Sequence, residues 1–184
     1  MNLPNKLTLT RIILVPVFMV FVSLTQIGTE DFNPTWYLVA GIIFAAASFT
    51  DFLDGHLARK WNMVTDFGKF ADPLADKMLV TAAMLWFVEI GQMPAWMLLI
   101  VICREFAVSG LRMVAASNGS VLAAGWSGKL KTTLQVAALI SYFLFIRTEY
   151  LWIAQALISL AVVMTLISGA LYICGYMKAR KRIS

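Results

Sequence analysis

Half of the acidic residues of this chain lie close together in a sequence that is otherwise strongly apolar. Five of its ten Asp and Glu residues fall between positions 51 and 76, namely Asp51, Asp54, Asp66, Asp72 and Asp76. A charged side chain at the centre of a membrane helix costs about 2.5–3.5 kcal/mol on insertion scales. Aspartates concentrated in apolar surroundings therefore indicate a functional site, and carboxylate oxygens are the groups that bind hard divalent cations.

Helical spacing places four of these aspartates on two stripes, because side chains three or four positions apart share one face of a helix. The stripes consist of Asp51, Asp54, Gly55 and Ala58 and of Gly68, Asp72 and Asp76. An antiparallel hairpin through residues 60–67 would turn the two stripes toward each other, so that four carboxylates converge. Asp66 is predicted in the bend without a metal role, and His56 lies off the stripe.

Four carboxylates held together repel one another and need protons or cations as partners. They suffice for two divalent ions (Mg²⁺, Mn²⁺ or Ca²⁺) roughly 3.5–4 Å apart, as in the two-metal sites of phosphoryl transfer. Such ions clamp a diphosphate and stabilise charge on the attacked phosphorus. The small residues Gly55, Ala58 and Gly68 would admit a bulky ligand. Alternatively, they are ordinary contacts between transmembrane helices; their position among the aspartates favours the ligand.

The composition indicates which elements carry these aspartates. Of 184 residues 60% are hydrophobic, whereas soluble domains average roughly 45–50%, and a membrane span needs about 20 mostly apolar residues. The apolar excess recurs along the whole chain. We therefore expect one all-α integral membrane domain, residues 1–184, with six transmembrane helices and a short N-terminal interfacial helix at residues 2–11. The predicted spans are 12–27, 35–56, 72–90, 93–116, 132–147 and 150–176.

The distribution of basic residues predicts the orientation. With the N-terminus inside, the connections at 28–34, 91–92 and 148–149 face outward, and Arg147 is the only basic residue near them among fifteen Lys and Arg. Because cytoplasmic loops carry the excess of Lys and Arg, both termini are predicted in the cytoplasm. The net charge of +5 does not indicate nucleic acid, since the basic residues form no exposed stripe with stacking aromatics.

Two other residue types have predicted places in such a bundle. Trp36, Trp86 and Trp96 are typical of the aromatic belt at a membrane–water interface. Cys103 and Cys174 lie in apolar stretches and are predicted to be small buried hydrophobes rather than a disulfide.

Residues 51–76 resemble the signature of the CDP-alcohol phosphotransferase family, D-x2-D-G-x2-A-R-x8-G-x3-D-x3-D. Every fixed position agrees: Asp51, Asp54, Gly55, Ala58, Arg59, Gly68, Asp72 and Asp76. The resemblance implies that the four aspartates hold two Mg²⁺ or Mn²⁺ ions and that Asp76 is also the base for the acceptor hydroxyl. It implies a CDP-donor site formed by Asp51, Asp54, Gly55, Ala58, Arg59 and Gly68. Family members are typically homodimers whose cavity opens to the cytoplasm and to lipid.

A second group of polar residues recurs beyond the signature: Lys77, Arg104, Arg112, Lys129, Lys131 and Gln135. Lys and Arg beside a metal site suit a second anion, so we expect this group to bind a phosphate carried by the acceptor. For Lys129 and Lys131 interfacial snorkelling is the alternative. The strings 2–11, 103–112 and 128–135 are similar to those of the bacterial phosphatidylglycerophosphate synthases. This resemblance implies transfer from CDP-diacylglycerol to glycerol 3-phosphate at the inner membrane of a bacterium.

Other functions remain as alternatives. The same chemistry could use phosphatidylglycerol, serine or an inositol phosphate as acceptor. Carboxylates on two membrane helices would also suit a divalent-cation transporter, although the spacing of the signature argues against it. A lipid-binding scaffold gives no reason for four converging aspartates.

Overall fold

The computed structural model describes residues 3–27, 29–61, 66–117 and 126–181, without the side chains of 3–8, 11, 51–61, 66–76, 116–117 and 179–181. In this part of the chain there are six helices and no strand. The helices are α1 (Leu3–Ser23), α2 (Pro34–Trp61), α3 (Asp66–Glu89), α4 (Ala95–Ser117), α5 (Trp126–Phe145) and α6 (Leu151–Lys181). The predicted all-α class is confirmed, and each predicted span corresponds to one helix.

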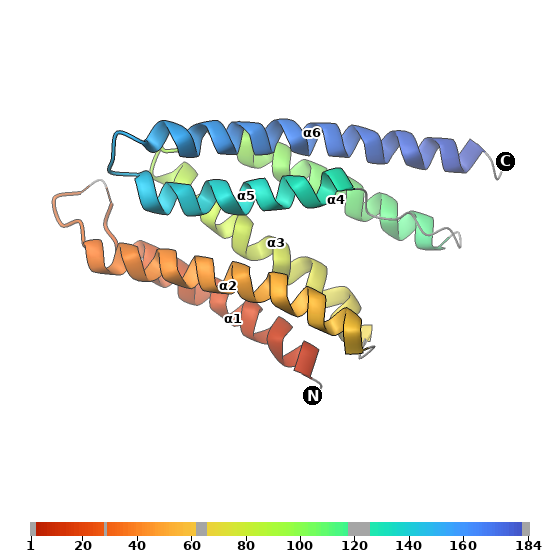
Figure 1. Ribbon diagram of the computed structural model, residues 1–184, viewed down its shortest axis with the longest axis horizontal. Helices are drawn as coiled ribbons and strands as arrows, with labels where there is room; N and C mark the ends of the chain where they lie inside the picture. Colours follow the sequence, from red (N-terminus) through yellow and green to blue (C-terminus); the bar gives the residue numbers. More distant parts are fainter. Residues whose placement is uncertain (1–2, 28, 62–65, 118–125, 182–184) are drawn as a thin grey trace. The chain divides into compact units, whose positions relative to one another are not determined.

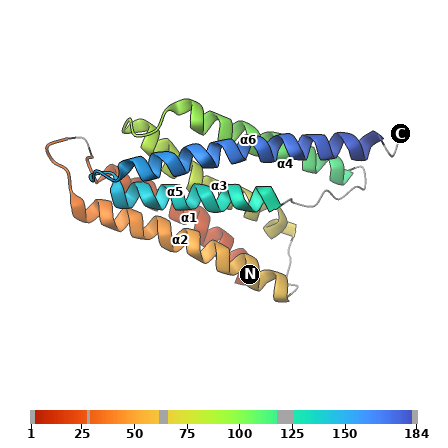
Figure 2. The same ribbon diagram turned by 45° about the horizontal axis from the view of Figure 1, so that its top comes forward.

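The chain divides into two compact units, an N-terminal unit (Met1–Gln92) and a C-terminal unit (Met93–Ser184). Within the N-terminal unit, α1 packs against both α2 and α3 (Figure 1). Within the C-terminal unit, α6 packs against both α4 and α5, and α5 and α6 run antiparallel side by side in both views (Figures 1 and 2). In each unit, therefore, one helix supports the other two.

Local sequence signals set several helix ends. The Asn33 side-chain oxygen accepts hydrogen bonds from two N–H groups of the first turn of α2, at 3.0 and 3.3 Å, and Pro34 begins the helix, where its missing N–H costs nothing. Beyond α3, Gly91 has a φ of 71°, which suits glycine. The Gln92 N–H then donates to the Phe87 carbonyl at 2.9 Å, closing the helix end with a Schellman motif.

The core of the N-terminal unit is apolar. Phe18 of α1 and Phe44 of α2 are fully buried, and their ring centroids lie 6.0 Å apart. The buried stripe of α3 consists of Leu79, Ala83, Met84, Trp86 and Phe87. Among the described side chains of this unit, Thr25 is the one buried polar residue, so packing of large apolar groups holds these helices together.

The prediction of a separate interfacial helix at residues 2–11 is wrong. Helix α1 runs without interruption from Leu3 to Ser23, and residues 3–11 therefore form its first turns. The reason lies in the position of the helix breakers. Pro4 falls in the first turn, where proline is tolerated, and no glycine or further proline occurs before Pro16.

Two predictions about burial are also wrong. Trp86 is only 3% exposed and its ring lies 4.9 Å from that of Phe87, because position 86 falls on the buried stripe of α3 rather than on its outer face. Cys103 and Cys174 are free, as predicted, but exposed. Each lies two residues from a position on the inward face of its helix, Val101 on α4 and Tyr172 on α6.

The helices combine apolar interiors with apolar exteriors. Among the residues described, α6 is long and apolar enough between Leu151 and Lys178 to cross a membrane, judged by length and composition, and Ile12–Ser23 and Pro34–Thr50 are shorter apolar helices. Large exposed apolar side chains occur on all six helices, for example Ile13, Leu38, Leu85, Leu99, Leu144 and Leu160. Such extensive apolar exposure is typical of a surface that another apolar phase covers.

Candidate functional site

The aspartate signature lies on the two helices that flank residues 62–65. Asp51, Asp54, Gly55, Ala58 and Arg59 belong to α2, and Gly68, Asp72 and Asp76 belong to α3. Asp66 is the first residue of α3. The eight signature side chains lie outside the described residues. The donor set itself, four carboxylates at the adjoining ends of consecutive helices, has the hard oxygen chemistry that Mg²⁺ and Mn²⁺ require.

The inward face of α5 carries polar residues where an apolar helix would carry a core. Gly128, Lys131, Thr132 and Gln135 lie three or four positions apart and therefore share that face. Lys131 is 5% and Gln135 3% exposed. Lysine and glutamine are rarely buried so fully unless they have partners, so this face points at a polar neighbour.

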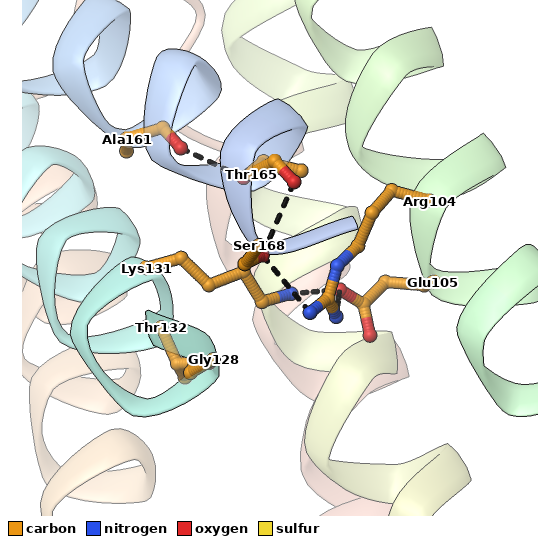
Figure 3. A network of polar contacts seen from close by, with 8 residues as sticks. All are labelled: Arg104, Glu105, Gly128, Lys131, Thr132, Ala161, Thr165 and Ser168. Carbon is orange, nitrogen blue, oxygen red and sulfur yellow. Dashed lines mark hydrogen bonds and ion pairs between the residues drawn. The ribbon is translucent and has the colours of Figure 1, made fainter. Parts of the chain in front are cut away.

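That neighbour is a pair of charged residues on α4. Arg104 Nη1 donates to Glu105 Oε1 at 3.0 Å, and Lys131 Nζ donates to the same carboxylate oxygen (Figure 3). The side chains of Arg104, Glu105 and Lys131 are 12%, 13% and 6% exposed. Two buried cations thus share one carboxylate oxygen.

Helix α6 completes the surroundings of Arg104. Arg104 Nη2 donates to Ser168 Oγ at 3.0 Å, while Ser168 Oγ donates to the Thr165 carbonyl at 3.1 Å (Figure 3). A Cβ placed on Gly169 would lie 3.1 Å from Arg104 Cγ, and one on Gly128 would lie 3.8 Å from Nη2. The arginine side chain therefore passes between α5 and α6 where both have a glycine.

Three buried polar atoms in this unit have no hydrogen-bond partner among the described residues. They are Arg104 Nε, Gln135 Nε2 and the Tyr172 hydroxyl. The first two can only donate, and the third can donate. Because an unsatisfied buried donor costs about 1–3 kcal/mol, and because the cluster is positively charged, its chemistry suits an anion with several acceptor oxygens.

Of the six residues predicted for the acceptor phosphate, the structure brings Arg104 and Lys131 together on Glu105. Gln135 is buried one turn beyond Lys131 on the same face of α5. Arg112 is exposed and lies eight residues further along α4. Lys129 is also exposed. Lys77 is half-buried in the N-terminal unit.

Sequence reasoning assigned no role to Glu105 or to α6. Glu105 is visible as a second charge in an apolar run, and a matching anion for Arg104 and Lys131 could have been inferred from it. The α6 residues give a fainter signal: Thr165, Ser168, Gly169 and Tyr172 follow one another at helical spacing within an apolar segment.

Comparison with known proteins defines the class. A model of the CDP-alcohol phosphatidyltransferase family matches residues 1–167, and the chain belongs to this family. The predicted family is thereby confirmed, and the protein is a transferase of phospholipid biosynthesis. Members of the family use divalent cations. Among the described side chains no group of three metal-ligating residues occurs, and the four signature aspartates lie outside them.

The similar proteins carry two names. The chain is 50% identical over 143 residues, 74% of each chain, to the CDP-diacylglycerol–glycerol-3-phosphate 3-phosphatidyltransferase of Bacillus subtilis. It is 40% identical to the protein of the same name from Shigella flexneri serotype 5b, over 94% of this chain and 93% of the relative. It is 37% identical to a probable phosphatidylglycerophosphate synthase of Mycobacterium tuberculosis, over 94% of this chain and 80% of the relative.

Proposed function

We propose that this protein transfers the phosphatidyl group of CDP-diacylglycerol to glycerol 3-phosphate, giving phosphatidylglycerophosphate and CMP. The names of relatives at 37–50% identity support both substrates. The observation that carries the acceptor is the cluster of Arg104, Lys131 and Glu105 with its net positive charge and unpaired donors. A neutral alcohol or an amine would satisfy neither, whereas a phosphate supplies charge and acceptor oxygens together.

The proposal divides the work between two sets of residues. Asp51, Asp54, Asp72 and Asp76 hold two divalent cations, Mg²⁺ or Mn²⁺, which when bound neutralise the donor diphosphate and the charge that develops on it. Gly55, Ala58, Arg59 and Gly68 bind the rest of the CDP group. Arg104, Lys131 and Gln135 bind the acceptor phosphate, together with the other residues predicted for it, Lys77, Arg112 and Lys129.

The chemical step then needs one base. Asp76 removes the proton from the acceptor hydroxyl, whose oxygen forms a bond to the lipid-side phosphorus of the donor. The bond from this phosphorus to the bridging oxygen breaks, and CMP leaves with the electron pair. Fixing the acceptor by its phosphate presents its hydroxyl in a defined orientation, which lowers the entropic part of the barrier.

The proposed setting is the inner membrane of a bacterium. Six spans with both termini in the cytoplasm are supported by exposed apolar side chains on every helix and by the one-sided distribution of Lys and Arg. A single domain of residues 1–184 is supported by the family match, which crosses the boundary between the two units. A homodimer is proposed from the resemblance to the family alone.

The test is CMP release by the purified protein in detergent with CDP-diacylglycerol, Mg²⁺ or Mn²⁺, and glycerol 3-phosphate. Release that needs the metal and glycerol 3-phosphate together is the expected result. Release only with serine, inositol phosphate or phosphatidylglycerol would overturn the acceptor. No release with any alcohol, together with metal uptake into proteoliposomes, would replace the enzyme by a transporter.

A further inference from the structure

Helix α6 presents one polar face in an otherwise apolar segment. Hydroxyl groups in such helices are commonly satisfied by their own backbone, and Thr165 follows this pattern by donating to the Ala161 carbonyl at 2.7 Å. Ser168 and Tyr172, one and two turns further along the same face, depart from this pattern. Ser168 has a partner on another helix, and Tyr172 has no partner among the described residues.

The Ser168 hydroxyl is committed in both directions. Its hydrogen is directed to the Thr165 carbonyl at 3.1 Å, so its lone pair is free to accept from Arg104 Nη2 at 3.0 Å. Ser168 is only 2% exposed, so its hydroxyl is not accessible to solvent. The neighbouring Gly169 leaves room for the arginine stem, since a Cβ there would lie only 3.1 Å from Arg104 Cγ. Helix α6 thereby fixes where the guanidinium of α4 lies.

Tyr172 has a buried hydroxyl that nothing in the described chain satisfies. Its position four residues after Ser168 places it on the same face of α6, one turn beyond the hydroxyl that accepts from Arg104. Arg104 Nε lacks a partner as well. Two unsatisfied donors from α4 and α6 in one positively charged neighbourhood are best explained by one shared acceptor, which a phosphate oxygen provides.

We propose that α6 forms part of the acceptor site: Tyr172 donates a hydrogen bond to the phosphate of the acceptor, and Ser168 is a positioning residue that holds Arg104. The inference rests on the proposed function. It adds a specificity-determining residue that lies beyond the part of the chain matched by the family model, which ends at residue 167. The hydroxyl discriminates in favour of an acceptor that carries its own phosphate.

The test is Tyr172→Phe, which removes one oxygen and keeps the ring. The KM for glycerol 3-phosphate is expected to rise about tenfold, as loss of a hydrogen bond to a charged group predicts, with kcat and the KM for CDP-diacylglycerol unchanged. Tyr150→Phe is the matched control, because Tyr150 is exposed in the connection before α6 and should behave like the wild type. An unchanged KM for glycerol 3-phosphate in Tyr172→Phe, or an equal rise for both substrates, would overturn the assignment.

Ser168 is tested through its dependence on Arg104. Ser168→Ala should raise the KM for glycerol 3-phosphate several-fold, Ser168→Thr should restore it by returning the hydroxyl, and Ser168→Ala should add nothing in an Arg104→Lys background. Additive effects in that background would refute positioning through Arg104. If the wild type itself shows no dependence on glycerol 3-phosphate, the proposed function fails. If it does and the α6 variants match it, only this inference fails.

Discussion

The two units of the protein share an arrangement and differ in what they bury. In the N-terminal unit α1 supports two helices over an apolar core, with Phe18 and Phe44 at 0% exposure. In the C-terminal unit α6 supports two helices over an interior that contains Lys131, Gln135 and Ser168. The first interior is almost entirely apolar, although the buried Ser48 hydroxyl has no partner among the described residues. The second contains three such polar atoms, on Arg104, Gln135 and Tyr172, and two cations that share one carboxylate.

This difference assigns different tasks to similar architecture. Buried ion pairs contribute little net stability, because desolvation offsets their attraction. Arg104, Glu105 and Lys131 are therefore poorly explained as a device for holding α4 and α5 in place, which apolar residues would do better. The proposed function explains their presence by ligand binding, and it leaves to the apolar unit the support of the helices that carry the aspartates.

The largest expected effect tests whether the chemistry belongs to the signature. Asp76→Asn should lower kcat about 10³-fold, within the range for loss of a general base, because an amide cannot accept the proton. The fold and the melting temperature should stay close to those of the wild type. Asp66→Asn is the matched control with near-normal turnover. Near-normal turnover in Asp76→Asn would remove Asp76 from the mechanism.

The next effect separates the buried arginine from the exposed one on the same helix. Arg104→Ala should raise the KM for glycerol 3-phosphate about 100-fold, as loss of a charge-assisted contact predicts. Arg112→Ala should raise it less than about tenfold, because solvent screens an exposed charge. Steady-state kinetics with each substrate varied in turn would measure both. Equal effects of the two variants would contradict a defined site around Arg104.

The smallest effect concerns the shared carboxylate. Glu105→Gln removes the carboxylate that Arg104 and Lys131 share and should destabilise the protein by about 3 kcal/mol, seen as a lower melting temperature in detergent. Glycerol 3-phosphate should then raise the melting temperature of the variant more than that of the wild type, since it restores a missing negative charge. Glu149→Gln, at an exposed position, should show neither change. The same ligand-induced shift in the wild type and in Glu105→Gln would refute the account of the cluster.

Much of the fold follows from the sequence, because apolar segments of helical length are bounded by clear signals such as Asn33-Pro34 and Gly91. The predictions that are wrong concern features that depend on neighbouring residues, such as the continuity of a helix and the burial of a side chain. Residue type alone predicts a separate helix at 2–11, yet nothing between Pro4 and Pro16 breaks a helix. Residue type also predicts Trp86 at a membrane interface, whereas its position on the buried stripe of α3 decides its burial.

The sequence predicts those residues of the candidate site that place a charge in an apolar segment, where burial of the charge costs free energy. Arg104 and Lys131 stand out because ionised groups in apolar runs need an explanation, and the structure brings them together on Glu105. Ser168 and Tyr172 do not stand out, since hydroxyl residues are inexpensive in apolar helices. Their significance depends on Arg104 reaching Ser168 from 64 positions away. The roles of Asp51, Asp54, Asp72 and Asp76 stay predictions.

The way in which α4 and α5 meet has a consequence for how such enzymes diversify. Both helices rest on α6, and in the described residues their backbones do not approach each other closely; they meet through the ends of Arg104, Glu105 and Lys131. Single substitutions of these side chains can change the shape and charge of the space between α4 and α5 and leave the backbone packing on α6 intact. On the proposed function, a change of acceptor alcohol is therefore a short evolutionary step, and redesign of acceptor preference can begin at these positions.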